Sequence, residues 1–575
     1  MNDPDQAALG ALPIAEDTDP GSSQHESIVR SAGVVSAGVM LSRLSGLVRE
    51  TIMARLFGAS MVYDAFSLGF RIPNLTRDLF AEGALSAAFV PTFTEYLATK
   101  GKREAAELSN LVGTAVLVMV GGVCLLGMLL SRALVGLLAP GWAAAEPAKL
   151  ELAIQLTRTM FPFLLLVALA AQAMGVLNAC HQFGIPAMSS TFFNLGSVGF
   201  GLLLGFLLGP RLGLAPIAGM AYGVVLGGLL QLLWQVPSLR RSGFSFRVRF
   251  NWSHPGLRHI IQLMGPAILG NAAVQINVMV TTFFASSIVD PIRGVNGPVS
   301  WLQYAFRFMQ LPLGLFGVAI ASATLPAISR SAASGNLEEF GRTLARSLGT
   351  VFLLTLPSSV GLAILGNSMI GVIYEGGKFQ AYDTRQTALA LAWYAVGLAG
   401  YAAAKVLAPA FYALGDARVP ALVSLASILI NFLVALTMLR LTRLGHAGLA
   451  VATSGVALFA SIALFTVLRG RVRSIPGRKL LLSLLKITLA SLVMGGAVAL
   501  TSNSIETWLG VTRGARLVEL AISIPLGAAV FLGMCRAVKV EELEAAVRAL
   551  RAPLARVVPW RRAKIRRKWL ECGFH

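Results

Sequence analysis

This sequence contains few charged residues. Charged residues make up only 13% of its 575 residues, whereas 55% are hydrophobic, and the mean hydropathy is +0.71. A soluble globular chain has about 25% charged residues. The middle of the chain also lacks the polar linkers that separate soluble domains. These two absences exclude an ordinary soluble protein of any number of domains.

The usual ligands of metals and redox groups are scarce as well. The six histidines show no metal-ligand spacing, and the four cysteines form no Cys-x-x-Cys pair. We therefore predict inert packing or surface cysteines, no metal and no cofactor. The loops contain no carboxylate cluster for metal binding or acid–base work, so an enzyme is not expected. The cysteines are Cys124, Cys180, Cys535 and Cys572.

Apolar residues occur instead in runs of about 20, the length that crosses roughly 30 Å of hydrocarbon. Open sheets would leave unpaired backbone groups in lipid, and such long runs are not barrel strands. The predicted fold is therefore an all-α integral membrane bundle. The fourteen predicted spans are 31–57, 63–90, 109–132, 152–179, 187–208, 214–237, 259–285, 300–325, 346–370, 387–412, 419–440, 447–469, 481–502 and 515–536.

Basic residues gather in alternate loops and account for much of the net charge of +21. This distribution is typical of cytoplasmic loops, and it argues against nucleic acid as a partner. Both termini are predicted to be cytoplasmic, which requires an even number of spans. We interpret the basic run that begins at Trp560 as an anchor near anionic lipid. The basic loop residues include Lys100, Lys102, Arg103, Arg240, Arg241, Arg247, Arg249, Arg258, Arg330, Arg342, Arg346, Arg469, Arg471, Arg473, Arg478 and Lys479.

An internal repeat divides the chain. Pro186, which lies between Ala179 and Ala187, recurs as Pro420 between Ala413 and Ala421, and Pro91 before a basic loop recurs as Pro326. Two units of six spans have the same orientation, which predicts two lobes around a central cavity. Spans thirteen and fourteen lie outside the repeat. The predicted parts are a disordered cytoplasmic leader (1–29), an N-lobe (30–238), a C-lobe (239–470), two added spans (471–536) and a basic cytoplasmic tail (537–575).

Charges stand where lipid should be in the first two spans. Arg43 and Arg49 lie near mid-depth of span one, and each would cost about 2.5–3.5 kcal/mol facing lipid at the centre of a helix. Seven such groups would cost on the order of 20 kcal/mol, more than a marginally stable fold tolerates. They must therefore face each other or a wet cavity. Span two adds Asp64, Arg71, Arg77, Asp78 and Glu82.

Helical spacing suggests how these charges are grouped. Arg43 and Glu50 are seven residues apart and share one face, whereas Arg49 is offset from it. Asp64, Arg71 and Asp78 share a second face, from which Arg77 is offset. Arg307 in span eight has no acidic partner in its own helix. The excess of arginine favours an anion, because a guanidinium binds phosphate oxygens in a bidentate manner. Purely structural ion pairing between helices is the alternative.

Polar residues in span seven allow two interpretations. Asn271, Gln275 and Asn277 lie near Pro266 and could contact a coupling cation. Hydrogen bonding between helices is the interpretation that we favour. Coupling to the membrane potential or to a monovalent ion therefore remains open.

Several motifs resemble one family closely and in order, from about residue 30 to 536. They include Ser42-Arg-Leu-Ser-Gly-Leu-Val-Arg-Glu, Ile72-Pro-Asn-Leu, Phe80-Ala-Glu-Gly-Ala-Leu-Ser, Leu311-Pro-Leu-Gly-Leu-Phe-Gly and Tyr374-Glu-Gly-Gly-Lys-Phe. The chain resembles the MurJ (MviN) lipid II flippases of the multidrug/oligosaccharidyl-lipid/polysaccharide exporter superfamily. The resemblance implies fourteen spans, a V-shaped cavity between two lobes, and a groove for the polyprenyl tail formed by spans thirteen and fourteen.

The resemblance also implies which residues matter. Essential family positions match Arg43, Arg49, Asp64, Arg77, Glu82 and Arg307, and Arg71 stands where the family has a lysine. The expected headgroup ligands are thus Arg43, Arg49, Arg71, Arg77 and Arg307, and the expected gating or structural charges are Glu50, Asp64 and Glu82. Departures from the pattern are Asp78 in place of a second arginine, and Phe306 and Gln310 in place of acids around Arg307. The resemblance places no sodium site residue by residue.

The leading hypothesis is therefore a flippase that moves lipid II, the undecaprenyl-diphosphate-linked disaccharide pentapeptide, across the bacterial cytoplasmic (inner) membrane by alternating access. The expected partners are lipid II and membrane lipids, and a monomer is expected. A drug/cation antiporter of the same superfamily is the alternative, and it predicts a cavity dominated by acidic and aromatic residues. A membrane-bound enzyme acting on polyprenyl-phosphate sugars is a third hypothesis, and it lacks the loop carboxylates it would need.

Overall fold

All regular secondary structure in the computed structural model is helical over the part of the chain that it describes, residues 20–78 and 85–544. Eleven of the helices there are long and apolar enough to cross a membrane. The other three predicted spans correspond to α1, α2 with α3, and α12, of which α1 and α2 carry the intramembrane charges. The all-α membrane fold predicted from the sequence is confirmed.

The helices of the N-terminal half run from α1 to α11. Proline in the first turn, where its missing N–H is not needed, begins several of them. A π-helical turn at Leu203–Leu207 extends α9. The helices are α1 (Pro20–Phe57), α2 (Met61–Arg77), α3 (Ser86–Thr99), α4 (Gly101–Leu129), α5 (Ser131–Leu138), α6 (Pro140–Ala145), α7 (Pro147–Met160), α8 (Pro162–Ala179), α9 (Gly184–Leu202), α10 (Gly209–Leu212) and α11 (Pro216–Arg241).

The helices of the C-terminal half run from α12 to α20. A second π-helical turn, Leu313–Val318, joins α13 to α14. The helices are α12 (Pro255–Ser286), α13 (Pro298–Pro312), α14 (Ala319–Ala333), α15 (Leu337–Ile373), α16 (Ala381–Ala413), α17 (Arg418–Leu441), α18 (His446–Arg471), α19 (Gly477–Leu509) and α20 (Arg513–Ala537).

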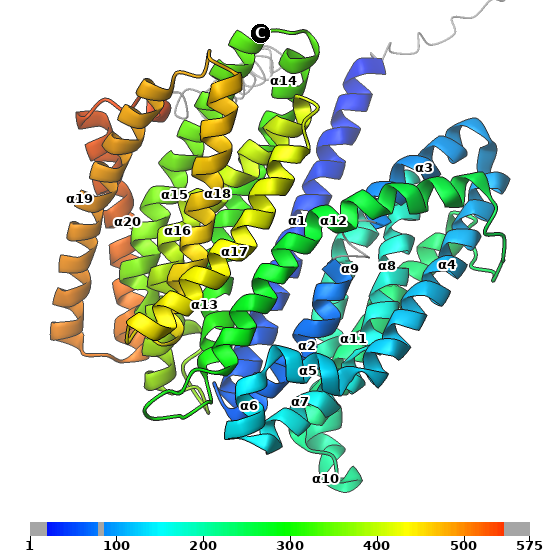
Figure 1. The fold of residues 1–575 in the computed structure, drawn as a ribbon, viewed down its shortest axis with the longest axis horizontal. Coiled ribbons are helices and arrows are strands. Elements are labelled where there is room, and N and C mark those ends of the chain that lie inside the picture. The colour runs from blue at the N-terminus through cyan, green and yellow to red at the C-terminus, as the bar shows by residue number, and fades with distance from the viewer. Residues whose placement is uncertain (1–19, 79–84, 545–575) are drawn as a thin grey trace, which may run out of the picture.

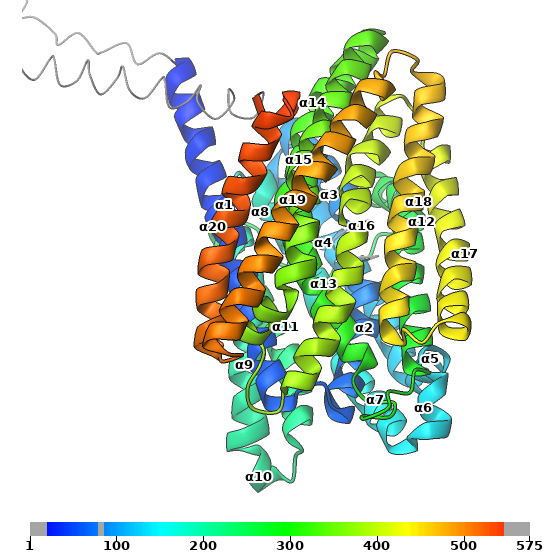
Figure 2. The same cartoon turned by 90° about the vertical axis from the view of Figure 1, so that its left-hand side faces the viewer.

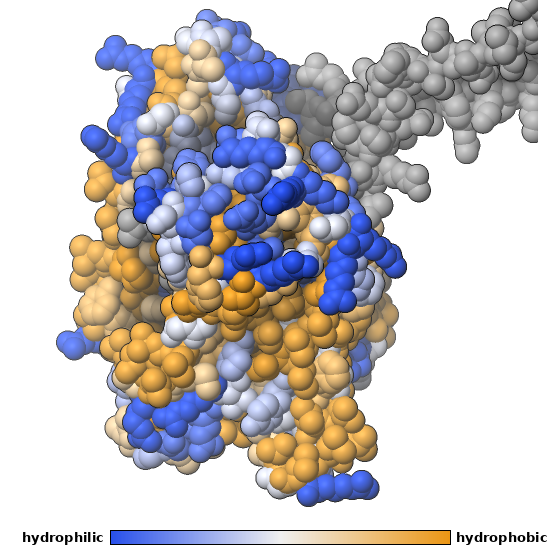
Figure 3. All heavy atoms as spheres, turned by 90° about the vertical axis from the view of Figure 1, so that its right-hand side faces the viewer, coloured by the Kyte–Doolittle hydropathy of each residue, from blue (hydrophilic) through white to orange (hydrophobic). Residues whose placement is uncertain are grey.

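Figure 1 shows the two halves as two groups of helices, with α1 and α12 between them. Helix α12 packs against α3 of the N-terminal half and against α17 of the C-terminal half. Helices α19 and α20 pack on each other and on α15, at the edge of the C-terminal half (Figure 2). The space-filling view has a broad apolar band between hydrophilic regions (Figure 3). Such a band suits a protein surrounded by lipid.

Apart from α12, buried side chains join the halves at one end only. The largest hydrophobic cluster contains Phe57 and Tyr63 from the N-terminal half and Tyr304, Tyr374 and Phe379 from the C-terminal half. We call the end with the loops 58–60, 287–297 and 374–380 the closed end. At the opposite end, the basic end with the loops 241–255, 334–336 and 472–476, the described residues form two separate clusters. One joins N-terminal helices to Leu257 and Ile260 of α12, and the other lies within the C-terminal half. Apart from α12, the two halves are therefore packed together at the closed end and apart at the basic end.

One predicted boundary differs from the structure. Helix α1 begins at Pro20, so its first turns lie in the segment 1–29 that was predicted to be a disordered leader. The predicted span 63–90 contains most of α2, which ends at Arg77, and the first part of α3, which begins at Ser86. Residues 1–19, 79–84 and 545–575 lie outside the described residues, and with them lie Glu82, Cys572 and most of the predicted basic tail.

Candidate functional site

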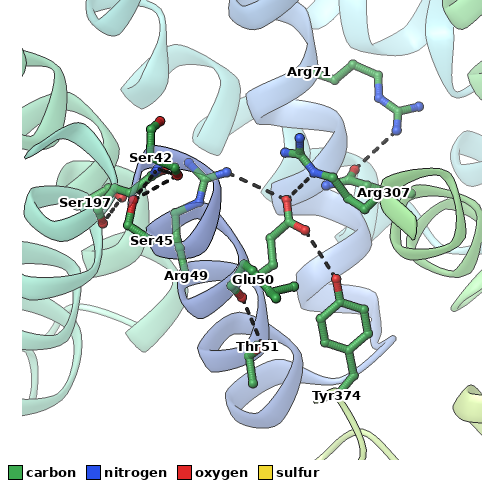
Figure 4. Close-up of polar contacts among 12 residues, drawn as sticks. Ser42, Ser45, Arg49, Glu50, Thr51, Arg71, Ser197, Arg307 and Tyr374 are labelled. Atoms are coloured by element: carbon green, nitrogen blue, oxygen red, sulfur yellow. Dashed lines mark hydrogen bonds and ion pairs between the residues drawn. The ribbon is translucent and has the colours of Figure 1, made fainter. Parts of the chain in front are cut away.

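Glu50 is the carboxylate around which the predicted site is built. It lies on α1 and is buried, with only 7% of its side chain exposed. Arg307 of α13 donates a hydrogen bond from Nε to Glu50 Oε1, and the hydroxyl of Tyr374 donates to Oε2 over 3.3 Å (Figure 4). One side chain of the N-terminal half is thus held by two side chains of the C-terminal half.

Arg49 is the second cation at Glu50. Its guanidinium lies 3.9 Å from Glu50 Oε1 and stacks over the rings of Phe70 and Phe193, with 5.8 and 5.4 Å to the ring centroids. The aromatic faces stabilise the cation where water is scarce. Arg307 has no acidic partner in its own helix, as the sequence indicated, yet both it and Arg49 lie at the carboxylate of Glu50. Helical spacing cannot reveal that both reach the same carboxylate, one from the next residue and one from another helix.

Arg71 extends from α2 to the C-terminal half, where its hydrogen-bond partners are neutral. Its Nη1 donates to Thr282 Oγ1 of α12 over 2.5 Å, and its Nη2 donates to Gln303 Oε1 of α13 over 3.2 Å. No carboxylate of the described residues forms an ion pair with it. Neutral partners orient this guanidinium and leave its positive charge uncompensated.

Arg43 lies closer to the basic end than Arg49 and is exposed. A Cβ atom built on Gly314, in the π-helical turn after α13, would stand 2.9 Å from its Nη2. Because Gly314 has no side chain, the guanidinium of Arg43 can extend toward the C-terminal half. Arg43 and Glu50 share one face of α1 but do not form an ion pair with each other, because Glu50 binds Arg307 and Tyr374 instead.

The predicted face of α2 is divided in the same way. Arg77 forms an ion pair of 2.9 Å with the neighbouring Asp78, and Arg71 and Asp64 each bind other elements. The cluster of Arg43, Arg49, Arg71, Arg77 and Arg307, here called the arginine cluster, forms ion pairs with Glu50 and Asp78 among the described carboxylates. Within the described residues, five guanidinium groups beside two carboxylates leave a local positive excess, which suits an anion.

Asp64 belongs to the closed end and not to the arginine cluster. Its carboxylate accepts hydrogen bonds from the backbone N–H groups of Gly297 and Ser300 and from the Ser300 hydroxyl, at the beginning of α13. Lys149 of α7 donates to Asp64 Oδ2 over 2.8 Å, and neither side chain is exposed. A carboxylate at a helix N-terminus is stabilised by unpaired N–H groups and by the helix dipole.

Lys149 was missed by sequence reasoning, because it lies in a segment read as a loop before span four. Its ammonium also donates to the carbonyl of Val295 and to Asn296 Oδ1, and it lies 4.2 Å from the ring centroid of Trp142. No sequence spacing marks this contact, since Asp64 and Lys149 are 85 residues apart. The only sequence signal that could have pointed to this contact is the position of Lys149 close to Trp142 and Pro147.

The turn 374–379 completes the closed end. Lys378 donates its backbone N–H to the carbonyl of Arg55 over 2.9 Å, and Arg55 donates to the carbonyl of Ile373 over 3.3 Å. Gly377 has φ +57°, and a Cβ there would stand 2.2 Å from the Arg55 carbonyl oxygen. Only glycine fits this approach of two backbones.

Replacing Gly377 by alanine is therefore expected to destabilise the protein by about 2 kcal/mol or more, since positive φ and a backbone clash add together. Thermal unfolding of the purified protein in detergent measures the change. Gly415→Ala is the matched control, because Gly415 has φ +75° and nothing within 4 Å of its Cβ position. Equal losses in both variants would contradict the close approach at Arg55.

The remaining predictions concern span seven and the cysteines. The side chain of Asn277 donates to the carbonyl of Ala273 in its own helix over 3.1 Å, and Asn431 of α17 donates to the backbone carbonyl of Asn277 over 3.1 Å. The interhelical bonding expected of the Asn277 side chain is therefore not what holds it. The side chain of Asn271 is not described. Cys124, Cys180 and Cys535 are free, and the first and last of them are buried.

The comparisons with known proteins agree with this architecture. The family model described as "Lipid II flippase MurJ" matches residues 53–518. A "Probable lipid II flippase MurJ" of Vibrio cholerae serotype O1 is 34% identical over 90% of this chain and 98% of its own length. A "Lipid II flippase MurJ" of Burkholderia cenocepacia is 32% identical over 88% of this chain and 96% of its own length.

Solved structures have the same fold. A structure titled "Lipid II flippase MurJ, inward closed conformation" matches with a TM-score of 0.70 and 25% identity, over 88% of this chain and 99% of the other. An inward-facing multidrug transporter of the MATE family matches with a TM-score of 0.64 and 16% identity, over 77% and 98% of the two chains, and this likeness shows the fold alone. From the family match over most of its length and the identity to its relatives, this multi-pass membrane protein belongs to the MurJ lipid II flippase family, whose members are transporters and not enzymes.

Proposed function

We propose that this chain moves lipid II from the cytoplasmic to the periplasmic leaflet of a bacterial cytoplasmic membrane. The relatives named above are described as lipid II flippases and come from bacteria. The single observation that carries the proposal is the arginine cluster, whose positive excess lies between two halves that, apart from α12, are packed together at the closed end only. A diphosphate is the anionic group of lipid II, and arginine binds such groups in a bidentate manner.

The proposed roles follow from what each side chain contacts. Arg43, exposed and close to Gly314, meets the diphosphate first. Arg71 is held by neutral hydrogen-bond acceptors, so its charge remains available to an anion. Arg49 lies against aromatic rings and shares the carboxylate of Glu50 with Arg307. Arg77 and Arg307 complete the headgroup site. Glu50, Asp64 and Glu82 act as gating or structural charges.

Glu50 competes with the substrate for the same cations. It pairs with Arg307 and Arg49 when no anion is present, and a diphosphate that takes over these arginines weakens the hold of the C-terminal half on Glu50. Binding would thereby loosen the contact between α1 and α13 and favour opening of the closed end. A ligand shifts a conformational equilibrium only by such a difference in affinity between the states.

The orientation in the membrane is part of the proposal. The basic loops support placing the basic end in the cytoplasm and the closed end in the periplasm, with both chain termini cytoplasmic. Transport then proceeds by alternating access between two lobes, 30–238 and 239–470. Helices α19 and α20, within 471–536, would hold the polyprenyl tail. A single copy of the chain would carry out the transport cycle. Coupling to the membrane potential or to a monovalent ion is compatible with this scheme.

The drug/cation antiporter hypothesis accounts less well for the site. It requires acidic residues to dominate, whereas five arginines face two described carboxylates. The aromatic rings of Phe70 and Phe193 lie against Arg49, and they therefore serve a side chain of the protein and not a bound drug cation.

Depletion of the protein in its native cell tests the proposal. Lipid II is expected to accumulate in the inner leaflet, where an enzyme added outside cannot reach it, and expression of the wild-type chain should restore access. If depletion alters drug efflux but leaves the distribution of lipid II between the leaflets unchanged, the result would contradict the proposal and favour the antiporter.

A further inference from the structure

The turn 374–379 contacts more elements than closing a loop requires. Tyr374, which is fully buried, donates its hydroxyl to Glu50 of α1, and Lys378 binds the backbone of Arg55 at the end of α1. Glu375, between them, accepts a hydrogen bond from Nη1 of Arg516 over 2.6 Å. Residues of one turn thus hold both α1 and α20.

Arg516 has little freedom to do anything else. It lies in the first turn of α20, and only 6% of its side chain is exposed. A Cβ on Gly371 of α15 would stand 2.0 Å from its Nη1, so the guanidinium lies directly on the backbone of α15. Glu375 also receives the hydroxyl of Thr384 over 2.7 Å. A buried guanidinium that loses its carboxylate is strongly destabilised, so α20 and the turn resist separation.

A second contact reinforces the same junction. Glu519, one turn further along α20, is buried and accepts hydrogen bonds from Ser368 of α15 over 2.5 Å and from Ser502 of α19 over 2.6 Å. The ends of α15, α19 and α20 are thereby joined by polar contacts that are shielded from lipid. Such buried hydrogen-bond networks fix one relative position of the helices that they join.

We propose that Arg516 and Glu375 are positioning residues for transport, which tie α20 to the turn that holds Glu50 and Arg55, so that the α19–α20 pair and the closed end move together. The role of α19 and α20 as contacts of the lipid tail rests on the proposed function. The tie itself does not, because it consists of contacts within the chain. Through it, a change in the position of α20 alters the hold of Tyr374 on the carboxylate that binds Arg307.

The test measures how often the closed end opens. Ala59 has no exposed surface and lies beside Gly58 at this end, so a cysteine there reacts with a maleimide only after opening. The full-length Ala59→Cys protein, with its four native cysteines replaced by serine, is placed in lipid nanodiscs. We expect Arg516→Gln to raise the labelling rate about tenfold, within the usual range of couplings between sites. Glu375→Gln should act alike.

Two further variants separate coupling from simple damage. The exchange of Arg516→Glu with Glu375→Arg restores the ion pair and should return the labelling rate to that of the parent. Arg471→Gln breaks the partly buried ion pair with Asp416 at the basic end of the same half, and it should leave the rate unchanged. If Arg516→Gln yields little folded protein, the exchange variant still allows the labelling rate to be measured.

An unchanged rate in folded Arg516→Gln, or an exchange variant that folds but labels as fast as the single variants, would overturn the proposal. No lipid II is present in this measurement. A chain that shows the coupling but fails to translocate lipid II would therefore support this inference and contradict the proposed function. A chain that translocates lipid II but shows no coupling would do the opposite.

Discussion

Transport by Arg43→Ala is expected to fall about tenfold to a hundredfold, since a hydrogen bond to a charged group contributes about 1.5–3 kcal/mol. The amount of protein in the membrane should not change. Arg43 is exposed, and no hydrogen bond or ion pair to another described residue holds it, so the fold does not depend on it. Arg43→Lys should recover only part of the activity, because an ammonium keeps the charge but loses the planar fork.

Protein abundance and lipid II translocation, measured in the same membranes, check this expectation. Arg211→Ala is the control, because Arg211 is an exposed arginine at the closed end, outside the arginine cluster. Abundance that falls in step with activity would show that Arg43 serves packing and would contradict a role in binding.

Arg49 and Arg307 are less suitable for this separation than their spacing in the sequence suggests. Both bind Glu50, so removing either leaves a buried carboxylate with one cation fewer. Their alanine variants should lose transport and also loosen the contact between α1 and α13. Only Arg43 offers a clean distinction between a binding residue and a structural one.

Lys149→Met is expected to cost about 3–5 kcal/mol of stability, the usual penalty for leaving a buried charge without its partner. Methionine keeps most of the length of the side chain, so the loss reports the charge and not a cavity. Asp64 would retain the N–H groups of Gly297 and Ser300 but no cation. Thermal unfolding of the purified protein in detergent and its level in the membrane measure the effect.

A neutral partner should restore much of this loss. Asp64→Asn combined with Lys149→Met removes both charges, and the double variant should be more stable than Lys149→Met alone. Arg132→Gln is the control, because the neighbouring pair Arg132–Glu151 is 68% and 44% exposed and should contribute less than about 1 kcal/mol. A double variant as unstable as the single one would show that the ion pair is not what Lys149 contributes.

Some of the site could be read from the sequence because the cost of charge in lipid is a local property. Arg43, Arg49, Arg71 and Arg307 had to avoid lipid wherever the helices went, and in the structure they lie between the two halves or against buried rings. Their partners could not be read in this way. Spacing along one helix relates Arg43 to Glu50, but a contact between helices depends on how α1 and α13 pack.

Within the described residues, the amino-acid sequence by itself determined the membrane class, the helices and the excess of arginine, because hydropathy, span length and charge are sums over neighbouring residues. Only the tertiary structure decided that Asp64 belongs to Lys149 and the start of α13, and that Glu50 belongs to Arg307 and Tyr374. These pairs join residues 85 to 324 positions apart. The physical reason is that a buried charge takes the partner that packing brings within hydrogen-bond distance, and packing is decided by the whole chain.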